Sequence, residues 1–484
     1  MLRQRLGEGT TLASAGRAGL ITSMSSSRDS SRRNFLKMAG LGGLALGAAA
    51  TPALSAAPRE AASNSDKSQA KNVIFMVADG MNIAALSLAH TYLQRTVNQT
   101  SQWMKLYREL PVVRALCETQ SASSLVTDSA AAASCWGIGE RITNGVINIT
   151  PDGRKPITLM QKMRKAKKRT GLVTTATATH ATPAGFVATI ASRANQDEIA
   201  PQYLERGVDV VLGGGTQYFS DALMGDYRKA GYAIALNRTE LLAYQGGTPL
   251  LGLFDKSHIP FEIDRLNDPA IAAHTPTLSE MTDAALRCLQ DSPDGFFLLV
   301  EGGRVDHAAH DNDAAAAIHD QIAFDATITT VLRFIEKHPD TLLVITTDHG
   351  TGGLQLNGMG SEDFVGKGSA YGESTPAFMR LTKFTMSHEM MMRRLKEFGP
   401  KGLAGLVVEK TGLQFKAADL SSIKDVKSLL SVLPKYIGIS WTSRNHTSEM
   451  VEFCAYGPGS GLFTPYLRND EVHAILLKAM GLSA

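Results

Sequence analysis

Cysteine is scarce in this sequence, and the few cysteines do not suggest a metal site. The 484 residues contain four of them, which are Cys117, Cys135, Cys288 and Cys454. No two form a CxxC pair and none stands in a Cys/His zinc spacing, so the pattern argues against a cysteine-bound metal. An oxidising compartment would permit a disulfide, but the spacing does not show which cysteines would pair.

Several other patterns are missing. No apolar run after residue 60 is long enough to span a bilayer. A Gly-rich turn ends the strand predicted at 209–215, but it contains no GxGxxG, which argues against a dinucleotide site. No Cys or Ser begins a CxPxR-like motif, which disfavours a sulfatase. The remaining composition, with 44% hydrophobic and 20% charged residues, is that of an ordinary soluble globular protein.

Excess positive charge is confined to the N-terminus. Residues 1–57 hold seven of the 49 Lys and Arg and two of the 46 Asp and Glu, so without them the formal charge changes from +3 to −2. The remaining chain therefore has no bulk electrostatic attraction to nucleic acid, and we expect no nucleic-acid partner.

The N-terminal segment has the pattern of an export signal. The run Ser31-Arg32-Arg33-Asn34-Phe35-Leu36-Lys37 fits the twin-arginine pattern, and an apolar stretch at 38–50 follows it. We predict a twin-arginine signal peptide at 1–57 and a polar linker at 58–70. The alternative is a chance arginine pair before an Ala-rich helix.

This signal would place the protein outside the cytoplasm. We expect a periplasmic or secreted protein that has no membrane span once the signal is cleaved. The twin-arginine route carries folded cargo, which suits a protein that must bind metal before export. The leader is long, and Met24 is an alternative to Met1 as the first residue.

Chemically reactive residues follow a buried strand predicted at 296–300. The next residues include Glu301, two glycines, Asp306, His307 and His310. In an open α/β sheet, ligands bind at the carboxyl ends of strands. Asp306 and His310 are four residues apart, so on a helix they share one face and can bind one ion. The alternative is a glycine turn, a helix cap at Asp306 and solvated histidines.

Two further predicted strands end in residues of the same kind. Asp79 follows the strand at 72–78, and Asp348 and His349 follow the strand at 342–347. For Asp79, a simple strand-terminating turn is the alternative. Carboxylates and imidazoles gathered from several strand ends suit zinc or a mixed zinc and magnesium cluster.

Asp128 and Ser129 precede a helix predicted from Ala130. The partial positive charge at a helix N-terminus favours both an alkoxide and a phosphoryl group. Ser129 is not in a GxSxG elbow, but a neighbouring metal cluster would lower the pKa of its hydroxyl and make it a nucleophile without a base. The alternative is that Asp128 or Ser129 merely caps the helix.

Another predicted strand, at 172–176, leads to His180 and Thr182. Arg193 lies ten residues past Pro183 and reaches the same region if the segment between them is helical. An isolated arginine is more often a surface residue. The segment 216–290 looks like mixed connecting structure without readable chemistry.

The order of predicted elements indicates an α/β fold. We predict a three-layer sandwich, in which a large and mainly parallel central sheet lies between helices, within a domain at 71–484. Residues 351–440 break the alternation of strands and helices, and we predict an inserted helical subdomain near the active face. Its predicted helical pieces are 387–398, 402–411 and 418–433.

In six stretches, taken in order, the chain resembles the alkaline phosphatase family. The stretches run from about residue 72 to 460 and are Val77-Ala78-Asp79-Gly80-Met81, Val126-Thr127-Asp128-Ser129-Ala130-Ala131, His180-Ala181-Thr182-Pro183-Ala184, Val300-Glu301-Gly302-Gly303-Arg304-Val305-Asp306-His307-Ala308-Ala309-His310, Thr347-Asp348-His349-Gly350 and His446-Thr447. Each stretch alone is a weak or moderate signal, whereas six in the family's order are highly specific.

The resemblance implies a site for two Zn²⁺ and one Mg²⁺. The implied ligands of the first zinc are Asp306, His310 and His446. Those of the second zinc are Asp79, Asp348 and His349. Those of magnesium are Asp79, Thr182 and Glu301, so Asp79 would bridge two sites.

The resemblance also implies the catalytic and substrate-binding residues. Ser129 would attack phosphorus in line and form a phosphoserine, while the first zinc would stabilise the leaving oxygen and then activate water. Arg193 would clamp the phosphate oxygens in a bidentate manner. Asp128 and His307 would complete the substrate site.

Two positions depart from one form of the family pattern. Members carry Asp or His where this chain has His180, and Lys or His where it has His307. With His at both positions, the resemblance implies that His180 contacts the third metal through water, which leaves retention of Mg²⁺ open. The 96 residues between His349 and His446 form a long insertion whose role is also open.

The chain is identified as a member of the alkaline phosphatase family that would hydrolyse small phosphate monoesters. Because the family is usually dimeric, a homodimer is the corresponding expectation. The nearest alternative is a phosphodiesterase or phosphotransferase of the same superfamily, whose members lack the third-metal set, so Thr182 with Glu301 favours the monoesterase. A non-catalytic phosphate- or metal-binding protein would have lost the nucleophile or a ligand, and none is lost here.

Overall fold

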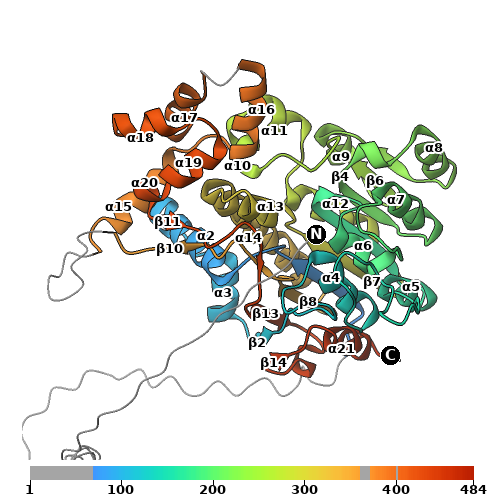
Figure 1. Cartoon of the computed structure of the whole chain (residues 1–484). Helices are drawn as coiled ribbons and strands as arrows, with labels where there is room; N and C mark the ends of the chain where they lie inside the picture. The colour runs from blue at the N-terminus through green and yellow to red at the C-terminus, as the bar shows by residue number, and fades with distance from the viewer. Residues whose placement is uncertain (1–68, 360–370, 399–401, 484) are drawn as a thin grey trace, which may run out of the picture. The chain divides into compact units, whose positions relative to one another are not determined.

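The computed structural model describes residues 69–359, 371–398 and 402–483 (Figure 1). The predicted signal peptide at 1–57 lies outside these residues, and so does the predicted linker up to residue 68. Ala70, which was assigned to the linker, is buried, and its N–H donates to the carbonyl of Ala479 at 2.8 Å. The folded unit therefore already includes Ala70.

A sheet of ten strands forms the centre, in the order β14-β2-β13-β8-β1-β7-β3-β4-β6-β5. The strands are β1 (Asn72–Val77), β2 (Val113–Cys117), β3 (Arg169–Thr177), β4 (Val210–Gly214), β5 (Ala233–Ala235), β6 (Leu250–Leu253), β7 (Phe296–Glu301), β8 (Thr341–Thr346), β13 (Val451–Tyr456) and β14 (Tyr466–Leu467). β13 runs antiparallel to β2 and β8, and the other neighbours pair in parallel. The predicted mainly parallel sheet is thus confirmed.

Alternate residues of each central strand face two separate cores, because side chains of a strand point to opposite faces of the sheet. On β1, Ile74 and Met76 join one core, and Val73 and Phe75 join the other. The first core is covered by α2 (Ile83–Val97), α3 (Gln102–Glu109), α9 (Arg238–Ala243), α10 (Glu262–Asn267), α12 (Leu278–Leu289), α13 (Arg304–His310) and α14 (Ala314–Lys337). The second is covered by α4 (Ser129–Ile138), α5 (Leu159–Lys165), α6 (Ala181–Val187), α7 (Gln196–Glu205), α8 (Asp221–Lys229) and α21 (Glu471–Ala479). This is the predicted three-layer arrangement (Figure 1).

The described residues of 351–440, which are 351–359, 371–398 and 402–440, are mostly helical. They contain α15 (Ser374–Met379), α16 (His388–Phe398), α17 (Leu403–Thr411), α18 (Ala417–Ser422), α19 (Val426–Val432) and α20 (Pro434–Ile437). Their buried side chains, such as Phe378 and Leu403, continue the core that contains α14. The single helix predicted at 418–433 is wrong, because the chain breaks into α18 and α19, and Asp425 caps α19 by accepting from the N–H of Ser428 at 2.8 Å.

Two short strand pairs tie this region to the core. β9 (Gly350–Thr351) pairs with β12 (His446–Thr447), and β10 (Gln355–Leu356) pairs with β11 (Ile439–Ser440). Both pairs are antiparallel, so the chain leaves and re-enters at the same place. The long excursion therefore returns His446 to a position beside Thr351, shortly after the end of β8.

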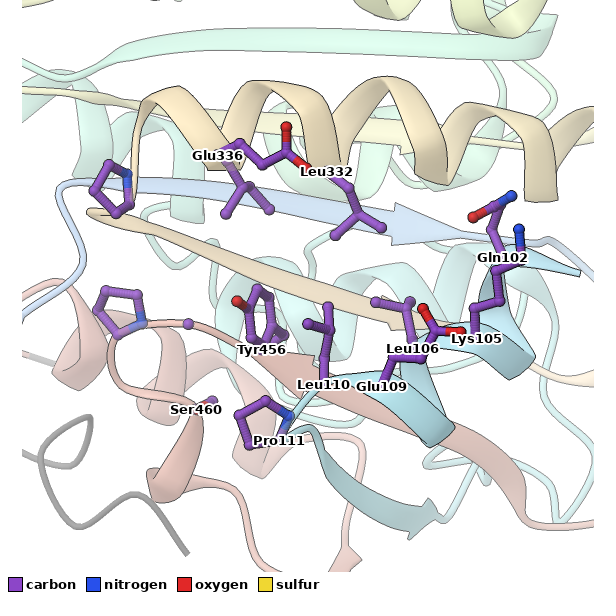
Figure 2. A pocket seen from close by; sticks show the side chains of 14 residues that line it. Gln102, Lys105, Leu106, Glu109, Leu110, Pro111, Leu332, Glu336, Tyr456 and Ser460 are labelled. Carbon is purple, nitrogen blue, oxygen red and sulfur yellow. The ribbon is translucent and has the colours of Figure 1, made fainter.

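A cavity of about 620 Å³ lies at the amino ends of the parallel strands (Figure 2). Leu106 and Leu110 line it from the side of α3, Leu332 from α14 and Tyr456 from the end of β13. None of the residues predicted for the metal cluster lines it. This hollow is therefore separate from the carboxyl ends of the strands, where the polar residues gather.

Two further observations bear on the predictions. All four cysteines are buried and free, so the structure contains four thiols and no disulfide between them. Among the residues that the structure describes, no helix combines the length and the apolar character that crossing a bilayer requires.

Candidate functional site

Neighbouring strands bring the predicted polar residues to one edge of the sheet. Asp79 follows β1, Glu301 ends β7 and Asp348 follows β8. The register pairs Val77 with Glu301 on one side and with Thr346 on the other, so these strand ends are level. Because adjacent strands lie about 4.8 Å apart, the three carboxylates converge.

The helix α13 places Asp306 and His310 one turn apart, as their spacing predicted. His310 Nε2 lies 3.3 Å from Asp306 Oδ2. Gly80 permits this helix to approach β1, because it has a φ of +69° and a Cβ there would lie 2.4 Å from Asp306 Oδ1. The alternative of a helix cap at Asp306 is excluded because the helix begins at Arg304 and Asp306 is buried, and the histidines are half-buried rather than fully solvated.

His310 and His446 meet at their Nε2 atoms, which are 3.0 Å apart beside Asp306. The Nδ1 of each ring lies against a backbone carbonyl, that of Arg444 for His310 and that of Thr127 for His446. Because a carbonyl oxygen can only accept, each Nδ1 donates and the Nε2 lone pairs face each other. Carbonyl-backed imidazoles that converge with a carboxylate are a typical zinc ligand set.

Asp79, Asp348 and His349 form a second group, and all three are buried. His349 Nε2 lies 3.2 Å from Asp348 Oδ2 and 3.7 Å from Asp79 Oδ1. Both of these carboxylate oxygens lack a hydrogen-bond partner among the described residues. Buried carboxylate oxygens without partners are unfavourable, so this donor set fits a cation.

Asp79 also belongs to a third group, with Glu301 and His180. Both carboxylate oxygens of Glu301 are buried, and no described residue bonds to them. Thr182 Oγ1 lies 3.5 Å from Asp79 Oδ2, and His180 Nδ1 lies 4.0 Å from the same oxygen. Two carboxylates and a hydroxyl are hard oxygen donors that suit Mg²⁺.

The pKa shifts of Asp79 and Glu301 agree with a shortage of positive charge around these two carboxylates. Burial raises the pKa of Asp79 well above its ordinary value, and the carboxylates of Asp348 and Asp306 raise it further. Burial also raises the pKa of Glu301 to about 7. Carboxylates that resist ionisation because they are buried together become favourable ligands once cations neutralise them.

Ser129 is the first residue of α4, and it faces the second group. Its Oγ lies 3.3 Å from His349 Nε2, and the residue is 1% exposed. Asp128 caps the helix, with Oδ1 accepting from the N–H of Ala131 at 3.0 Å. The alternative that Asp128 caps the helix is therefore confirmed, while the Ser129 side chain faces His349 in the second group.

Arg193 reaches the site, although not by the predicted route. The segment between α6 and Arg193 is not helical, because the chain extends and Ile190 pairs with Ile147. The Arg193 guanidinium donates from Nη1 to Asp128 Oδ2 and from Nη2 to His180 Nε2, both at 3.1 Å. Asp128 thus links the cap of α4 to the arginine.

Three imidazoles, those of His180, His258 and His307, form a wall beside Arg193. The ring of His307 lies 5.3 Å from that of His180 and 4.3 Å from that of His258, centre to centre. The backbone N–H of Thr177 donates to His258 Nδ1 at 3.1 Å. Burial and neighbouring positive charge lower the pKa of each ring, so the wall is uncharged.

Two residues of this site were missed by the sequence analysis. His258 lies in the segment 216–290, which showed no readable chemistry, and its one signal is a histidine shortly after an apolar strand, β6. Thr351 donates from Oγ1 to Asp306 Oδ1 at 2.6 Å. The signal that could have found it is its position two residues after His349 in the chain.

Comparison of the sequence with known proteins agrees with this geometry. The family model described as alkaline phosphatase matches residues 70–482. Alkaline phosphatase 3 of Bacillus subtilis (strain 168) is 30% identical over 458 residues, which cover 93% of this chain and 97% of that protein. Alkaline phosphatase 4 of the same organism is 26% identical over 468 residues, with the same two coverages of 93% and 97%.

Solved structures of similar proteins share the fold. The alkaline phosphatase of Thermus thermophilus superimposes with a TM-score of 0.79 at 30% identity, covering 88% of this chain and 95% of that one. The cold-active enzyme of a psychrophilic Shewanella species gives a TM-score of 0.73 at 29% identity, covering 84% and 99%. The chain therefore belongs to the alkaline phosphatase family and is an enzyme of its phosphomonoester hydrolase class.

Proposed function

We propose that this enzyme hydrolyses phosphate monoesters through a phosphoserine on Ser129, at a site that holds two Zn²⁺ and one Mg²⁺. The observation that carries the proposal is the arrangement of three ligand groups, two of which share Asp79, around the hydroxyl at the start of α4. The histidine-containing groups suit zinc, and the oxygen donors of Asp79, Thr182 and Glu301 suit magnesium.

The proposed first step uses the hydroxyl of Ser129, which lies 3.3 Å from His349 Nε2. Ser129 Oγ forms a bond to phosphorus while the bond to the leaving alcohol oxygen breaks, and the alcohol departs with a proton. The cations, when bound, would lower the pKa of the Ser129 hydroxyl and offset the charge on the leaving oxygen. Water then attacks the phosphoserine, which releases inorganic phosphate and restores the hydroxyl.

Arg193 and His307 would bind the substrate. A guanidinium offers paired N–H donors that match two phosphate oxygens. Asp128 holds Arg193 by its Nη1, so the arginine is positioned before substrate arrives. Arg193 also donates to His180 from Nη2. A guanidinium has five N–H groups, so further donors remain for a phosphate.

For the third metal, we propose that His180 acts through a water molecule. Its Nδ1 is buried, lacks a partner among the described residues and lies 4.0 Å from Asp79 Oδ2. That separation is longer than a hydrogen bond, and Mg²⁺ usually keeps several waters.

The substrate class and the metals are tested together. Protein reconstituted with Zn²⁺ and Mg²⁺ is assayed on an aryl phosphate monoester and on the matching diester, and its metals are measured by elemental analysis. We expect at least a hundredfold preference for the monoester, with two zinc ions and one magnesium ion per chain. A preference for the diester would favour the phosphodiesterase alternative instead.

Export and assembly are further parts of the proposal. The twin-arginine pattern supports delivery to the periplasm or beyond, and replacing Arg32 and Arg33 by lysine should leave precursor in the cytoplasm. Unchanged delivery would disprove this route. We also propose a homodimer that acts on small phosphate monoesters without a nucleic-acid partner, and sedimentation of the mature protein measures the assembly.

A further inference from the structure

A buried arginine stands behind the imidazole wall. The side chain of Arg304 is 3% exposed, and its guanidinium lies 3.7 Å above the centre of the Phe261 ring. Its Nη1 lies 2.8 Å from His307 Nδ1, and its Nη2 lies 2.5 Å from Glu389 Oε2. Arg304 thus bridges the wall and the helix α16, which belongs to the 351–440 region.

Glu389 supplies the charge that balances this arginine. A buried guanidinium without a counter-charge is strongly unfavourable. Burial alone would raise the pKa of Glu389, but the charge and the hydrogen bond of Arg304 lower it, so this carboxylate is ionised. Asp320 is also near Arg304, yet burial raises its pKa well above the ordinary value, which leaves Glu389 as the charged partner.

The bridge decides which nitrogen of His307 carries the proton. A guanidinium only donates, so His307 Nδ1 must accept from Arg304 and the neutral ring carries its proton on Nε2. Among the described residues, none forms a hydrogen bond with His307 Nε2, and His307 is half-buried. The ring lies 5.3 Å from that of His180, which bonds to Arg193, so this N–H remains as a donor for an oxygen bound beside these residues.

We propose that Glu389 is a positioning residue, which acts through Arg304 to hold His307 as an Nε2–H donor toward a substrate phosphate oxygen or its bound water. This rests on the proposed function for the identity of the substrate. It gives the 351–440 region a role in the reaction, because that region supplies the carboxylate while the catalytic edge supplies the histidine.

The bridge offers a matched pair of variants. Glu389 also binds Arg393, with Oε1 2.6 Å from Nη2, but the Arg393 side chain is 50% exposed. Arg393→Ala removes this outer ion pair and leaves the inner one in place, whereas Glu389→Gln removes the charge beside Arg304. Both changes lie on the same helix, so they share any general effect on α16.

The proton position is measured first, on zinc- and magnesium-loaded protein with ¹⁵N-labelled histidine, where the His307 signals are assigned with His307→Gln. We expect an unprotonated Nδ1 and a protonated Nε2 in the wild type and in Arg393→Ala. We expect mixed tautomers in Glu389→Gln, or in Glu389→Asp if the first variant does not fold. A protonated Nδ1 in the wild type would disprove the proposal.

Kinetics separate positioning from a merely structural role. A donor that binds phosphate equally in the ground and transition states affects KM more than kcat. We expect Glu389→Gln to raise KM for a monoester about tenfold with kcat changed less than twofold, and Arg393→Ala to change neither. Equal effects of the two variants would overturn the proposal. If the wild type lacked phosphomonoesterase activity, the proposed function would fail, while the tautomer measurement would still decide the role of Glu389.

Discussion

Buried carboxylates occur in two regions of this molecule with opposite surroundings. At the junction of α14 with the 351–440 region, every oxygen of Asp313 is used. Its Oδ1 accepts from the N–H of Ala316 at 3.0 Å, and its Oδ2 accepts from the N–H of His388 at 2.6 Å. Asp313 therefore caps one helix and fastens the start of another.

At the carboxyl edge of the sheet, several carboxylate oxygens accept no hydrogen bond from the described residues. Asp79 Oδ1, Asp348 Oδ2 and both oxygens of Glu301 are buried without a partner among the described residues. Protein interiors normally satisfy such atoms, because an unsatisfied buried polar atom lowers stability by about 1–3 kcal/mol. Acids whose oxygens accept hydrogen bonds, such as Asp313, stabilise the fold. Acids whose buried oxygens have no such partner are candidates for binding cations.

The largest effect is expected from the nucleophile. Ser129→Ala should lower kcat by more than about 10³-fold and abolish the covalent phosphoenzyme, because it removes the hydroxyl that lies 3.3 Å from His349 Nε2. Radiolabelled phosphate trapped on denatured protein measures the intermediate. Since Ser129 is not among the proposed ligands, the variant should keep its metals, and loss of zinc would show that Ser129 serves the ligand groups instead.

Replacing a carboxylate that has no hydrogen-bond partner should lower activity but raise the stability of the metal-free protein. Glu301→Gln should lower activity about a hundredfold and weaken Mg²⁺ retention, because it removes a charged ligand. In metal-free protein the same change should raise the melting temperature relative to wild type. Elemental analysis and thermal unfolding measure the two effects.

The pH dependence of this second effect has a definite sign. The folded-state pKa of Glu301 is raised to about 7 from an ordinary 4.5, so the wild type loses stability as pH rises through that window. Glutamine does not titrate, so the advantage of the variant should grow from about pH 4.5 to pH 7. An advantage that is constant with pH would mean that Glu301 is already neutralised by protein groups.

A satisfied carboxylate should behave in the opposite way. Asp313→Ala leaves two N–H groups unpaired and should lower the free energy of unfolding by about 2 kcal/mol. Turnover of the metal-loaded variant, measured well below its melting temperature, should stay within about twofold of wild type. Urea unfolding measures the free energy of unfolding. A large loss of activity without a loss of stability would show that the two regions do not differ in this way.

The smallest expected effect concerns the third metal. His180→Asp adds a hard anionic donor near Asp79 and should raise the affinity for Mg²⁺ about tenfold. The control is His258→Asp, in which the changed imidazole lies in the same wall but outside the three ligand groups. Magnesium is titrated into the zinc-loaded proteins while activity is followed. If His180→Asp needs as much Mg²⁺ as wild type, His180 does not act at this metal.

Local features of the sequence predicted a large part of the site. Asp306 and His310 are four residues apart on one helical turn, and Asp79 and Asp348 each follow an apolar run that was predicted to be a strand. The Ala-rich run after Ser129 predicted the helix whose N-terminus carries it. Strand and helix periodicity are local, so spacing along the chain was enough.

Contacts between distant segments were beyond this reasoning. Arg193 reaches Asp128 by an extended path that no helical pattern indicated, and His258 enters from a loop that carries no motif. The break at Asp425 between α18 and α19 was missed because a cap in the middle of a helix-like stretch competes with good helix formers on both sides. Propensity alone does not decide such a competition.

By itself, the sequence determined the kinds of donor, their strand ends and the family to which the chain belongs. Only the tertiary structure brought the donors together into groups, since the order of β8, β1 and β7 in the sheet places Asp79 between Glu301 and Asp348. It also decided that Glu389 contacts Arg304, which lies 85 residues earlier in the chain. The physical reason is that a buried charge needs a counter-charge within a few ångströms, and folding alone determines which distant segment brings it there.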